Sequence, residues 1–512
     1  MATQWQTFPF EFKGGLISNM SPLQHGIQAI GSATILQNFE PNKEGGYAKI
    51  KGYTKYDPDV IPGSGPVLGV KVVNAGELIA VRSDGSNSKV YHSSGTGWTL
   101  KATASLNGAK ARFAELNFGA GHKIIIVDSV NYPAVFDDST NAVTYLTSPA
   151  DVQGASFVSL YKTTAFYAKG TNLYFTAPST YDDFSAANGG GVINVGHEIT
   201  GLAVFRDQLF VFSRNSIRRI AGSSIADFEI IPVTDKIGCI NADTIQEVGG
   251  DIMYVAPDGI RLLSATDRIG DFGLDIPSDV IAKDAYNFLQ SATNFSSIVL
   301  REKAQYRIFA YVQSEQAGAA RGLIATKFSS QGAGSIAWAT TKGIKVYCAD
   351  SKYTAGYAET TVFAHDDGYV YQLNTGSSFD GENIEAIYES PYMSITDAKL
   401  RKTFYKLTVY AEPTGTMELS VNLKYDFDTR TNTGVIQPTP ITIGSTGGSV
   451  FVYGSAGSTY GTATYGGELD KVYSENIIGS AKTVAIRFED NSTNPTFTLD
   501  TAILEFRQND RQ

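Results

Sequence analysis

A repeated strand pattern organises the middle of this sequence. Residues 202–220, LAVFRDQLFVFSRNSIRRI, contain two alternating apolar runs, each followed by a turn signal, and a third run that ends at Ile220. Alternating runs separated by tight turns predict three short antiparallel strands. Shifted forward by 43 residues, the pattern returns in residues 245–263, IQEVGGDIMYVAPDGIRLL, with Leu209 over Ile252. A fixed period of this size indicates a repeat architecture.

Several strands in each period of about 40 to 50 residues are typical of β-propeller blades. One small sheet cannot bury both of its faces and therefore needs a neighbour on each side. Stretches that resemble the middle strand of the repeat recur along the chain, and they give seven candidate strands. They are centred near Leu78, Ile124, Ala165, Leu209, Ile252, Ile308 and Val362. We therefore predict an all-β fold with a propeller of six or seven blades.

One short helix is expected to interrupt the repeats, in residues 274–290, LDIPSDVIAKDAYNFLQ. Ser278 is the predicted N-cap. The apolar residues that follow it fall on one face of a helix, and they are Ile281, Ala285, Phe288 and Leu289. This insertion explains the long spacing before the strand at Ile308.

The chain divides into three predicted regions. Residues 1–60 form an extended N-terminal arm that packs on sheets, and residues 61–380 form the propeller. After residue 380 the alternating strands are longer, as in TMELSVNLKYDFD, which favours an antiparallel β-sandwich domain over residues 381–512. Its long loop, residues 444–467, is rich in Gly, Ser, Thr and Tyr, and we expect it to order against a partner.

Composition supports the all-β class and narrows the possible functions. A content of 51 glycines and 12% aromatic residues fits a turn-rich β protein. The formal net charge of −10 argues against a protein that binds nucleic acid by neutralising phosphates, although DNA could still slide past its surface. The only cysteines, Cys239 and Cys348, are expected to fill apolar space rather than form a disulfide.

The first residues, MATQWQTFPFEFKGG, lack a basic start followed by an apolar segment, and no later stretch reaches the roughly 18 apolar residues of a membrane span. We expect a soluble protein without a Sec-type export signal.

No arrangement of residues predicts catalysis, a cofactor or a metal. The scattered histidines lack metal-ligand spacing, and they are His25, His92, His122, His197 and His365. A propeller glycosidase would need carboxylates converging at its mouth. Hairpin-turn chemistry explains the acidic pairs more simply, and these are Asp137-Asp138, Asp182-Asp183 and Asp366-Asp367.

The glycine-rich and arginine-rich stretches also favour structural roles. Gly63-Ser64-Gly65 and Gly189-Gly190-Gly191 lack the helix and the Lys-Ser/Thr of a phosphate loop. One basic concentration is interleaved with Phe205, Phe210 and Phe212, as on a nucleic-acid surface. We expect its members on a solvated face and in ion pairs between blades, and they are Arg206, Arg214, Arg218, Arg219 and Arg261.

Four stretches, taken in order, resemble the tail nozzle proteins of short-tailed bacteriophages, also called packaged-DNA stabilisation proteins. They are residues 38–56 (NFEPNKEGGYAKIKGYTKY), 201–222 (GLAVFRDQLFVFSRNSIRRIAG), 234–264 (TDKIGCINADTIQEVGGDIMYVAPDGIRLLS, with the helix at Ser278 after it) and 485–507 (AIRFEDNSTNPTFTLDTAILEFR). The resemblance spans most of the chain, and its weight comes from the order of the motifs.

The resemblance implies a structural protein of the virion tail rather than an enzyme. In that family a hexameric ring docks under the portal and adaptor rings and forms the distal channel through which DNA leaves. The implied partners are further copies of the chain, a tail adaptor and fibres or spikes, with DNA passing without sequence-specific binding. A negative lumen would keep DNA from adhering, and residues 444–467 are the candidate gate. The alternative is a carbohydrate-recognising propeller, as a receptor-binding protein or a polysaccharide-active enzyme.

Overall fold

The computed structural model describes most of the chain as strands connected by turns. It describes residues 5–21, 30–73, 76–117, 121–224, 226–264, 276–328, 336–354, 358–415, 417–427, 435–436, 441–443 and 472–509. The predicted all-β class is confirmed, with many small antiparallel sheets and one helical insertion. Within these ranges no helix is both long and apolar enough to cross a membrane.

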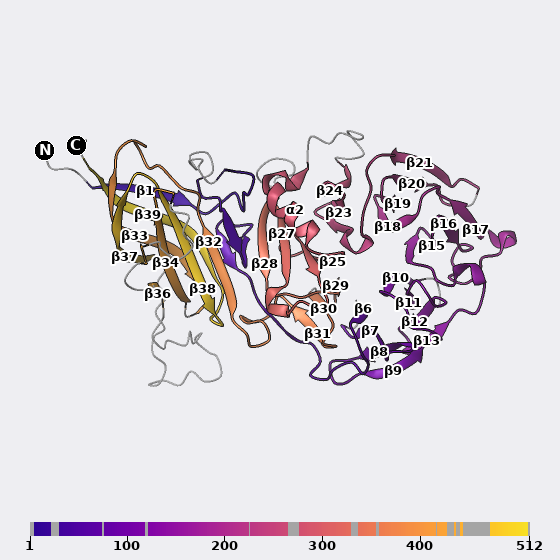
Figure 1. Ribbon diagram of the computed structural model, residues 1–512. Coiled ribbons are helices and arrows are strands. Elements are labelled where there is room, and N and C mark those ends of the chain that lie inside the picture. The colour runs from indigo at the N-terminus through magenta and orange to yellow at the C-terminus, as the bar shows by residue number, and fades with distance from the viewer. Residues whose placement is uncertain are drawn as a thin grey trace, which may run out of the picture. The chain divides into compact units, whose positions relative to one another are not determined.

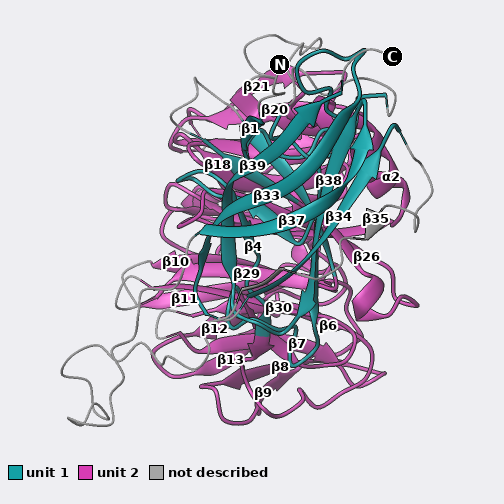
Figure 2. Cartoon of the chain, turned by 90° about the vertical axis from the view of Figure 1, so that its left-hand side faces the viewer, with its two compact units in different colours: residues 1–53, 324–342, 374–512 teal, residues 54–323, 343–373 magenta. Residues whose placement is uncertain are grey.

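The chain forms two compact units, each assembled from separated segments (Figure 2). Unit 1 contains residues 1–53, 324–342 and 374–512. Unit 2 contains residues 54–323 and 343–373. The N-terminal arm therefore belongs mostly to the same unit as the C-terminal strands, and a short segment from the late repeats joins it there.

Unit 2 contains six separate small sheets and one further group of strands, and these follow one another along the chain (Figure 1). The first four are β6 (Val67–Val72) to β9 (Thr99–Thr103), β10 (Arg112–Asn117) to β13 (Ala142–Tyr145), β14 (Phe157–Tyr161) to β17 (Gly191–Asn194), and β18 (Ile199–Phe205) to β21 (Glu229–Thr234). The last three are β22 (Gln246–Val248) to β24 (Gly259–Leu262), β25 (Asn294–Leu300) with β26 (Gln305–Tyr311) and the start of β27 (Arg321–Lys327), and β29 (Cys348–Tyr353) to β31 (Val370–Leu373).

All seven strands expected from the repeat spacing are present, and each is the second strand of its sheet. They are β7 (Leu78–Ser83), β11 (His122–Val127), β15 (Thr164–Lys169), β19 (Gln208–Ser213), β23 (Asp251–Ala256), β26, and β30 (Glu359–Ala364). The 43-residue register also holds in the pairing, because Phe212 pairs with Ile217 and Val255 pairs with Ile260. All four of these side chains are buried.

The sheets of unit 2 bury their faces against one another in chain order. Apolar side chains form shared cores between successive sheets from β6–β9 through β22–β24. The strands β25 and β26 are joined to the preceding sheet by hydrogen bonds. The hydroxyl of Tyr306, for example, donates to the carbonyl of Thr244 at 2.8 Å. The last sheet packs on the first through a core that includes Val70 and Val362. The sheets joined by these cores shield one another's apolar faces from water.

The last sheet is completed from the opposite end of the sequence. The strand β5 (Tyr53–Lys55) lies beside β31, so the order of this sheet is β29-β30-β31-β5. The backbone N–H of Tyr56 donates to the carbonyl of Val370 at 2.9 Å and extends this junction. The residues just before the first sheet thus supply the outer strand of the final one.

The predicted helix is confirmed, but its capping residue is not. Residues Pro277–Ile281 form a 3-10 turn, η5, that leads into α2 (Ala282–Gln290). Ala285 and Phe288 are buried as expected, whereas Leu289 is only half-buried. Ser278 does not cap the helix, because its hydroxyl instead accepts the backbone N–H of Ile260, at 3.1 Å. Pro277 begins the helical segment, which starts earlier than the Ser278 cap required.

Unit 1 contains two larger groups of hydrogen-bonded strands. One has the order β3-β4-β39-β33-β37, with β1 also on β39, and the other includes β28-β2-β32-β38-β34-β35 with β36 on β34. Their bounds are β1 (Gln6–Glu11), β2 (Ile35–Gln37), β3 (Phe39–Pro41), β4 (Tyr47–Lys49), β28 (Ile336–Lys342), β32 (Ile384–Glu389), β33 (Lys402–Pro413), β34 (Met417–Tyr425), β35 (Val435–Ile436), β36 (Ile441–Ile443), β37 (Val472–Ala481), β38 (Val484–Ser492) and β39 (Phe497–Gln508).

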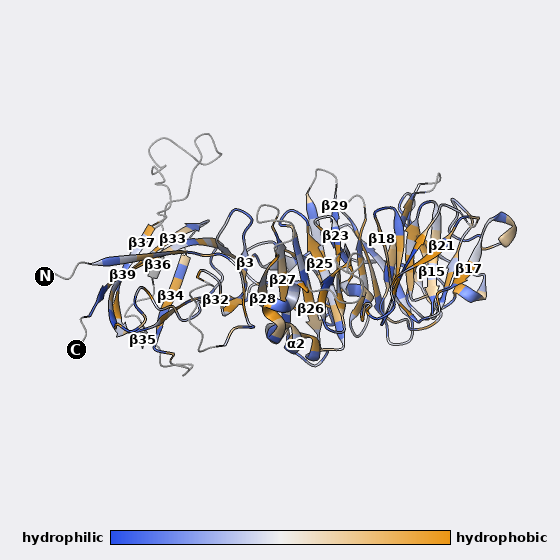
Figure 3. Ribbon diagram, turned by 90° about the horizontal axis from the view of Figure 1, so that it is seen from above, coloured by the Kyte–Doolittle hydropathy of each residue, from blue (hydrophilic) through white to orange (hydrophobic). Residues whose placement is uncertain are grey.

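The strands expected after residue 380 are confirmed as β32, β33, β34, β38 and β39. Strand β37 was not predicted, because only two of its ten residues are buried and it lacks a clear apolar alternation. Hydrophobic and hydrophilic residues both occur along the strands in Figure 3. The proposed gate, residues 444–467, lies outside the described residues.

Aromatic rings join the N-terminal arm to both groups of strands in unit 1. Phe12 is 1% exposed, and its ring centroid lies 5.0 Å from that of Tyr388 and 6.0 Å from that of Phe488. Tyr47, on β4, lies 5.6 Å from Tyr388. Edge-to-face aromatic contacts of this kind add to the free energy of burial. The arm is therefore an integral part of the core of unit 1.

Candidate functional site

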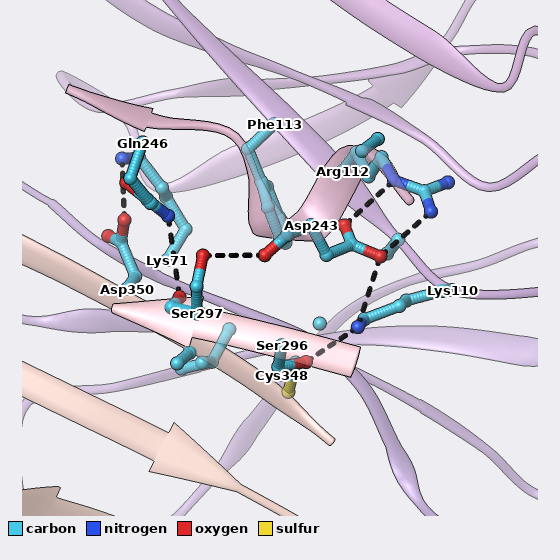
Figure 4. Close-up of a pocket in the computed structure, with 15 residues that line it drawn as sticks. Lys71, Lys110, Arg112, Phe113, Asp243, Gln246, Ser296, Ser297, Cys348 and Asp350 are labelled. Carbon is cyan, nitrogen blue, oxygen red and sulfur yellow. Dashed lines mark hydrogen bonds and ion pairs between the residues drawn. The ribbon is translucent and has the colours of Figure 1, made fainter. Parts of the chain in front are cut away.

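A polar cavity of about 190 Å³ lies inside unit 2, where the first strands of several sheets meet (Figure 4). Its walls come from β6, β10, β25 and β29, from β22, and from a single 3-10 turn, η4 (Ala242–Thr244). The polar side chains that line it are Lys71, Lys110, Arg112, Asp243, Gln246, Ser296, Ser297 and Asp350. Segments far apart in the sequence thus place both signs of charge around one space.

The carboxylate of Asp243 forms ion pairs with the side chains of Lys110 and Arg112. Its Oδ1 accepts from Nε of Arg112 and its Oδ2 accepts from Nη2, both at 2.9 Å, which is a bidentate pair. The Nζ of Lys110 lies 3.1 Å from the same Oδ2. The side chain of Asn241 accepts the backbone N–H of Asp243 at 2.9 Å and caps η4. This cap holds the carboxylate toward the cations.

Glu115 and Asp350 form a second group of ion pairs. The Nζ of Lys71 lies 2.8 Å from Glu115 and 3.2 Å from Asp350. The Nζ of Lys352 lies 2.5 Å from the other carboxylate oxygen of Glu115. Asp350 also accepts the backbone N–H of Val72 at 2.8 Å. These bonds join the first strands of three sheets, β6, β10 and β29.

The local charges keep the two central carboxylates ionised. Burial alone would raise the pKa of Glu115, but its two lysine partners outweigh burial and lower that pKa to about 2. Burial likewise opposes ionisation of Asp243, and the neighbouring Lys110 and Arg112 lower its pKa to about 2. Burial would lower the pKa of Lys71, whereas Asp350 and Glu115 raise it. At neutral pH these side chains carry full and opposite charges.

This arrangement suits cohesion better than acid-base chemistry. A glycoside hydrolase needs one carboxyl group that stays protonated near neutral pH and a second that is ionised. Glu115 and Asp243 are both ionised, so neither can donate the proton to a leaving group. Lys110 is also engaged by the hydroxyl of Ser296, at 2.7 Å. The charged groups form ion pairs and hydrogen bonds with one another, and these bonds connect the first strands of the sheets.

None of the described histidines lines this cavity, and two of them, His92 and His365, are buried rather than on the surface. His122 lies between Glu115 and Asp138, at 3.1 Å from each. His92 pairs with Glu77 and His365 with Asp366, while His197 is exposed and His25 lies outside the described residues. Across the ranges that the structure describes, no three His, Cys, Asp or Glu side chains are arranged to hold a metal ion.

The three acidic pairs lie in separate turns. Asp137 accepts the N–H and hydroxyl of Ser139, at 3.0 and 2.6 Å, in the turn after β12 (Ala134–Asp137). Asp183 accepts the N–H of Ser185 at 2.9 Å. Asp367 accepts the N–H of Tyr369 at 3.0 Å in the turn before β31. These placements agree with hairpin-turn chemistry.

Three arginines of the repeat contact nearby protein groups, and Arg261 is buried, at 4% exposed, rather than on the solvated face that we expected. Arg218 pairs with Asp235 at 2.8 Å, and Arg261 pairs with Asp258 of its own hairpin. Arg206 donates to the carbonyl of Gly250 on the next sheet at 3.1 Å, so that link between sheets is a hydrogen bond to backbone rather than an ion pair. The interleaved rings of Phe205, Phe210 and Phe212 are at most 7% exposed and cannot stack on bases.

The remaining sequence candidates have structural positions. Both cysteines are buried and free, and burial raises the pKa of each thiol to about 12. Gly189 ends the 3-10 turn η3 (Ala186–Asn188) with a left-handed φ of 99°, and Gly191 begins β17. Gly63 and Gly65 belong to the bend before β6. Neither glycine group precedes a helix that could hold a phosphate.

Sequence reasoning missed the charged residues of the cavity and of the ion pairs beside it, although a signal was present. Lys71, Glu115 and Asp350 stand on first strands, flanked by apolar residues in GVKVV, FAELN and YCADS. Charges at alternate positions of buried strands point to paired groups. The strands were aligned on their apolar second members, so the first strands were not compared with one another.

Comparisons with known proteins give no relative that assigns a family. No protein-family model matches the chain, and no curated protein matches it significantly.

Proposed function

We propose that unit 2 is a seven-bladed β-propeller and that unit 1 is a β-sandwich. Seven sheets packed in chain order, with each repeat anchor as a second strand, support the blade count. Strand β5, at the outer edge of the last sheet, corresponds to the strand that closes such a ring. In unit 1, the ring of Phe12 contacts Tyr47 of one group of strands and Tyr388 and Phe488 of the other, as expected of two sheets packed face to face.

We further propose that the chain is a structural protein of a phage tail that forms the distal nozzle ring. In this proposal six copies dock below the adaptor and conduct DNA during ejection, with fibres or spikes as further partners. The observation that carries this proposal is that Glu115 and Asp243 are both held in ion pairs with Lys and Arg side chains. This pairing favours a structural role for the first strands of the sheets in unit 2. The ordered resemblance of residues 38–56, 201–222, 234–264 and 485–507 supplies the specific family.

The acidic balance supports passage of DNA without binding. The chain carries 41 basic and 51 acidic residues. Six copies would multiply even a few phosphate contacts into strong binding, so a channel that releases DNA needs few exposed cations. Replacing acidic lumen residues with Lys is expected to slow genome ejection in vitro while leaving assembly intact. Unchanged ejection kinetics would count against this mechanism.

Negative-stain electron microscopy of the recombinant protein, alone and mixed with adaptor-bearing particles, tests the nozzle. Six-fold rings with a central channel, in either sample, are the expected result. Isolated single copies in both samples would reject it.

The second candidate is a carbohydrate-recognising propeller, and the polar cavity favours it. Ser296, Ser297 and Gln246 place hydroxyl and amide groups at its wall, which suit the hydroxyl groups of a sugar. A glycan screen distinguishes the two candidates. Saturable binding that is lost in the Gln246→Leu variant would favour recognition of carbohydrate.

A further inference from the structure

A lysine and an aspartate meet in the core of unit 1 with no exposure to solvent. Lys49 ends β4 and Asp490 belongs to β38, so the two residues come from opposite ends of the chain. The Nζ of Lys49 lies 3.1 Å from Oδ2 of Asp490, and both side chains are 0% exposed. Other ion pairs of unit 1, such as Lys424 with Glu389, keep some contact with solvent, at 16% and 12%. Complete burial makes the Lys49–Asp490 pair unusual in this chain.

The surroundings orient the amine and the carboxyl group toward each other. The Nζ of Lys49 also donates to the carbonyl of Ser492 at 3.1 Å and contacts the carbonyl of Asn494 at 3.4 Å. The hydroxyl of Ser492 donates to Oδ1 of Asp490 at 2.5 Å and lies 3.4 Å from Nζ. The Ser492 hydroxyl therefore stands beside both reacting groups and can pass a proton between them.

Burial also favours the uncharged forms of both side chains. It lowers the pKa of the Lys49 ammonium, against the attraction of Asp490. It raises the pKa of the Asp490 carboxyl group, against the hydrogen bonds from Ser492 and Lys49. An ion pair in a low-dielectric core is costly, whereas transfer of one proton gives a neutral amine beside a neutral acid. These are the forms in which an amine can attack a carboxyl carbon.

We propose that Lys49 and Asp490 condense to an intramolecular isopeptide bond in the folded protein. The Nζ lone pair attacks Cγ, the Nζ–Cγ bond forms and one Cγ–O bond breaks. The departing oxygen leaves as water, with the hydrogen of the acid and one hydrogen from the amine. The side chains are already in contact, so reaching an amide bond of about 1.33 Å requires only local movement. No oxidant or second substrate is needed.

The bond would tie the N-terminal arm covalently to β38. It would restrict the unfolded chain by closing most of the sequence into one loop, which stabilises the folded state. This inference rests on the core of unit 1 alone and stands apart from the proposed function.

Intact mass spectrometry of the full-length denatured protein is the first test. The expected mass is that of the sequence minus one water molecule. Trypsin should then release a branched peptide that joins residues 44–51 to residues 488–507, because acylated Lys49 is no longer cleaved. Separate peptides 44–49 and 488–507 with no mass loss would overturn the proposal, as would a mass loss without the branched peptide.

Variants give a matched comparison. Lys49→Arg and Asp490→Ala should both restore the full mass, and the denatured chains should migrate more slowly in gel electrophoresis than the looped wild type. Lys402→Arg is the control, because Lys402 is equally buried but donates to the carbonyls of Asp397 and Lys482. It should keep the mass loss and the branched peptide. If a variant fails to fold, the wild-type peptide map alone still decides the question.

Discussion

At the residue scale, the carboxylate of Asp243 pairs with two cationic side chains, Lys110 and Arg112. Its removal would leave Lys110 and Arg112, which are 14% and 24% exposed, without their counter-charge. We expect Asp243→Ala to lower the free energy of unfolding of unit 2 by roughly 3 kcal/mol, since unpaired buried charges are costly. Urea titration followed by fluorescence measures it.

The control for this experiment is Asp235→Ala. Asp235 pairs with Arg218 but is 63% exposed, so its loss should cost less than about 1 kcal/mol. Equal effects of the two substitutions would contradict the importance of the buried network.

The same carboxylates predict how stability depends on pH. The folded pKa of Glu115 and of Asp243 is about 2, below the roughly 4 of an unfolded carboxyl group. A lowered folded pKa contributes stability above the unfolded pKa, and this contribution is lost as the pH falls toward 2. We expect the wild-type unfolding free energy to drop between about pH 4 and pH 2 more steeply than that of Asp243→Asn. Parallel curves would exclude this role.

The buried thiols give a prediction about reactivity. Burial raises the pKa of Cys239 and Cys348 to about 12, and the thiolate is the reactive form. The native protein should therefore not react with a thiol reagent at pH 8, while two thiols should react in guanidinium chloride. Rapid reaction of the native protein would show that one of these cores opens.

What could be predicted of single residues depended on how far away their partners lie. The turn aspartates, such as Asp137 and Asp183, bond to residues two positions on, so local sequence was sufficient. Asp243 and Lys49 find their partners more than a hundred residues away. No spacing rule relates such residues until the sheets bring them together.

At the element scale, the N-terminal arm depends on Phe12. Truncation of a fully buried ring leaves a cavity and removes four aromatic contacts, with Phe10, Tyr47, Tyr388 and Phe488. We expect Phe12→Ala to destabilise unit 1 by roughly 3–5 kcal/mol. Limited proteolysis should then cleave the arm. Trp5→Ala, at a ring that is 56% exposed, is the control and should leave the arm protected.

Strands could be predicted from the sequence where apolar residues alternate or form short runs. They were harder to predict where only contacts with a neighbouring strand hold them in place. The second strands of the sheets are buried and appear as short apolar runs, and all seven were found. Ser278 was misassigned because its hydroxyl serves a backbone group on the neighbouring hairpin rather than the helix. Strand β37 owes its place to the long strand β33, and its own exposed residues carry little pattern.

At the scale of the whole molecule, the acidic balance predicts weak attraction to DNA. With a net charge of −10, the purified protein should not retain duplex DNA in native gels at about 100 mM salt. A variant with exposed Glu198 and Glu229 changed to Lys should bind more strongly than the wild type. Tight, salt-sensitive binding by the wild type would contradict a passive channel.

The sequence order suggested three consecutive regions, whereas each compact unit collects separated segments. Periodicity reports on neighbours within a sheet, and so it described the sheets of unit 2 well. It carries no information on the pairing of β2 with β32 or of β4 with β39, because these three-residue strands meet partners that lie hundreds of residues away.

The pairing of those short strands determines the order in which segments can fold as the chain is synthesised. Most sheets of unit 2 are made of consecutive strands, so each can form soon after it leaves the ribosome. Strand β2 must wait for β32, and although β4 can pair with β3 at once, its pairing with β39 must wait for that late strand. Domains that fold as they emerge do so from the N-terminus. Here strands β2 and β4 are translated early and gain their long-range partners late.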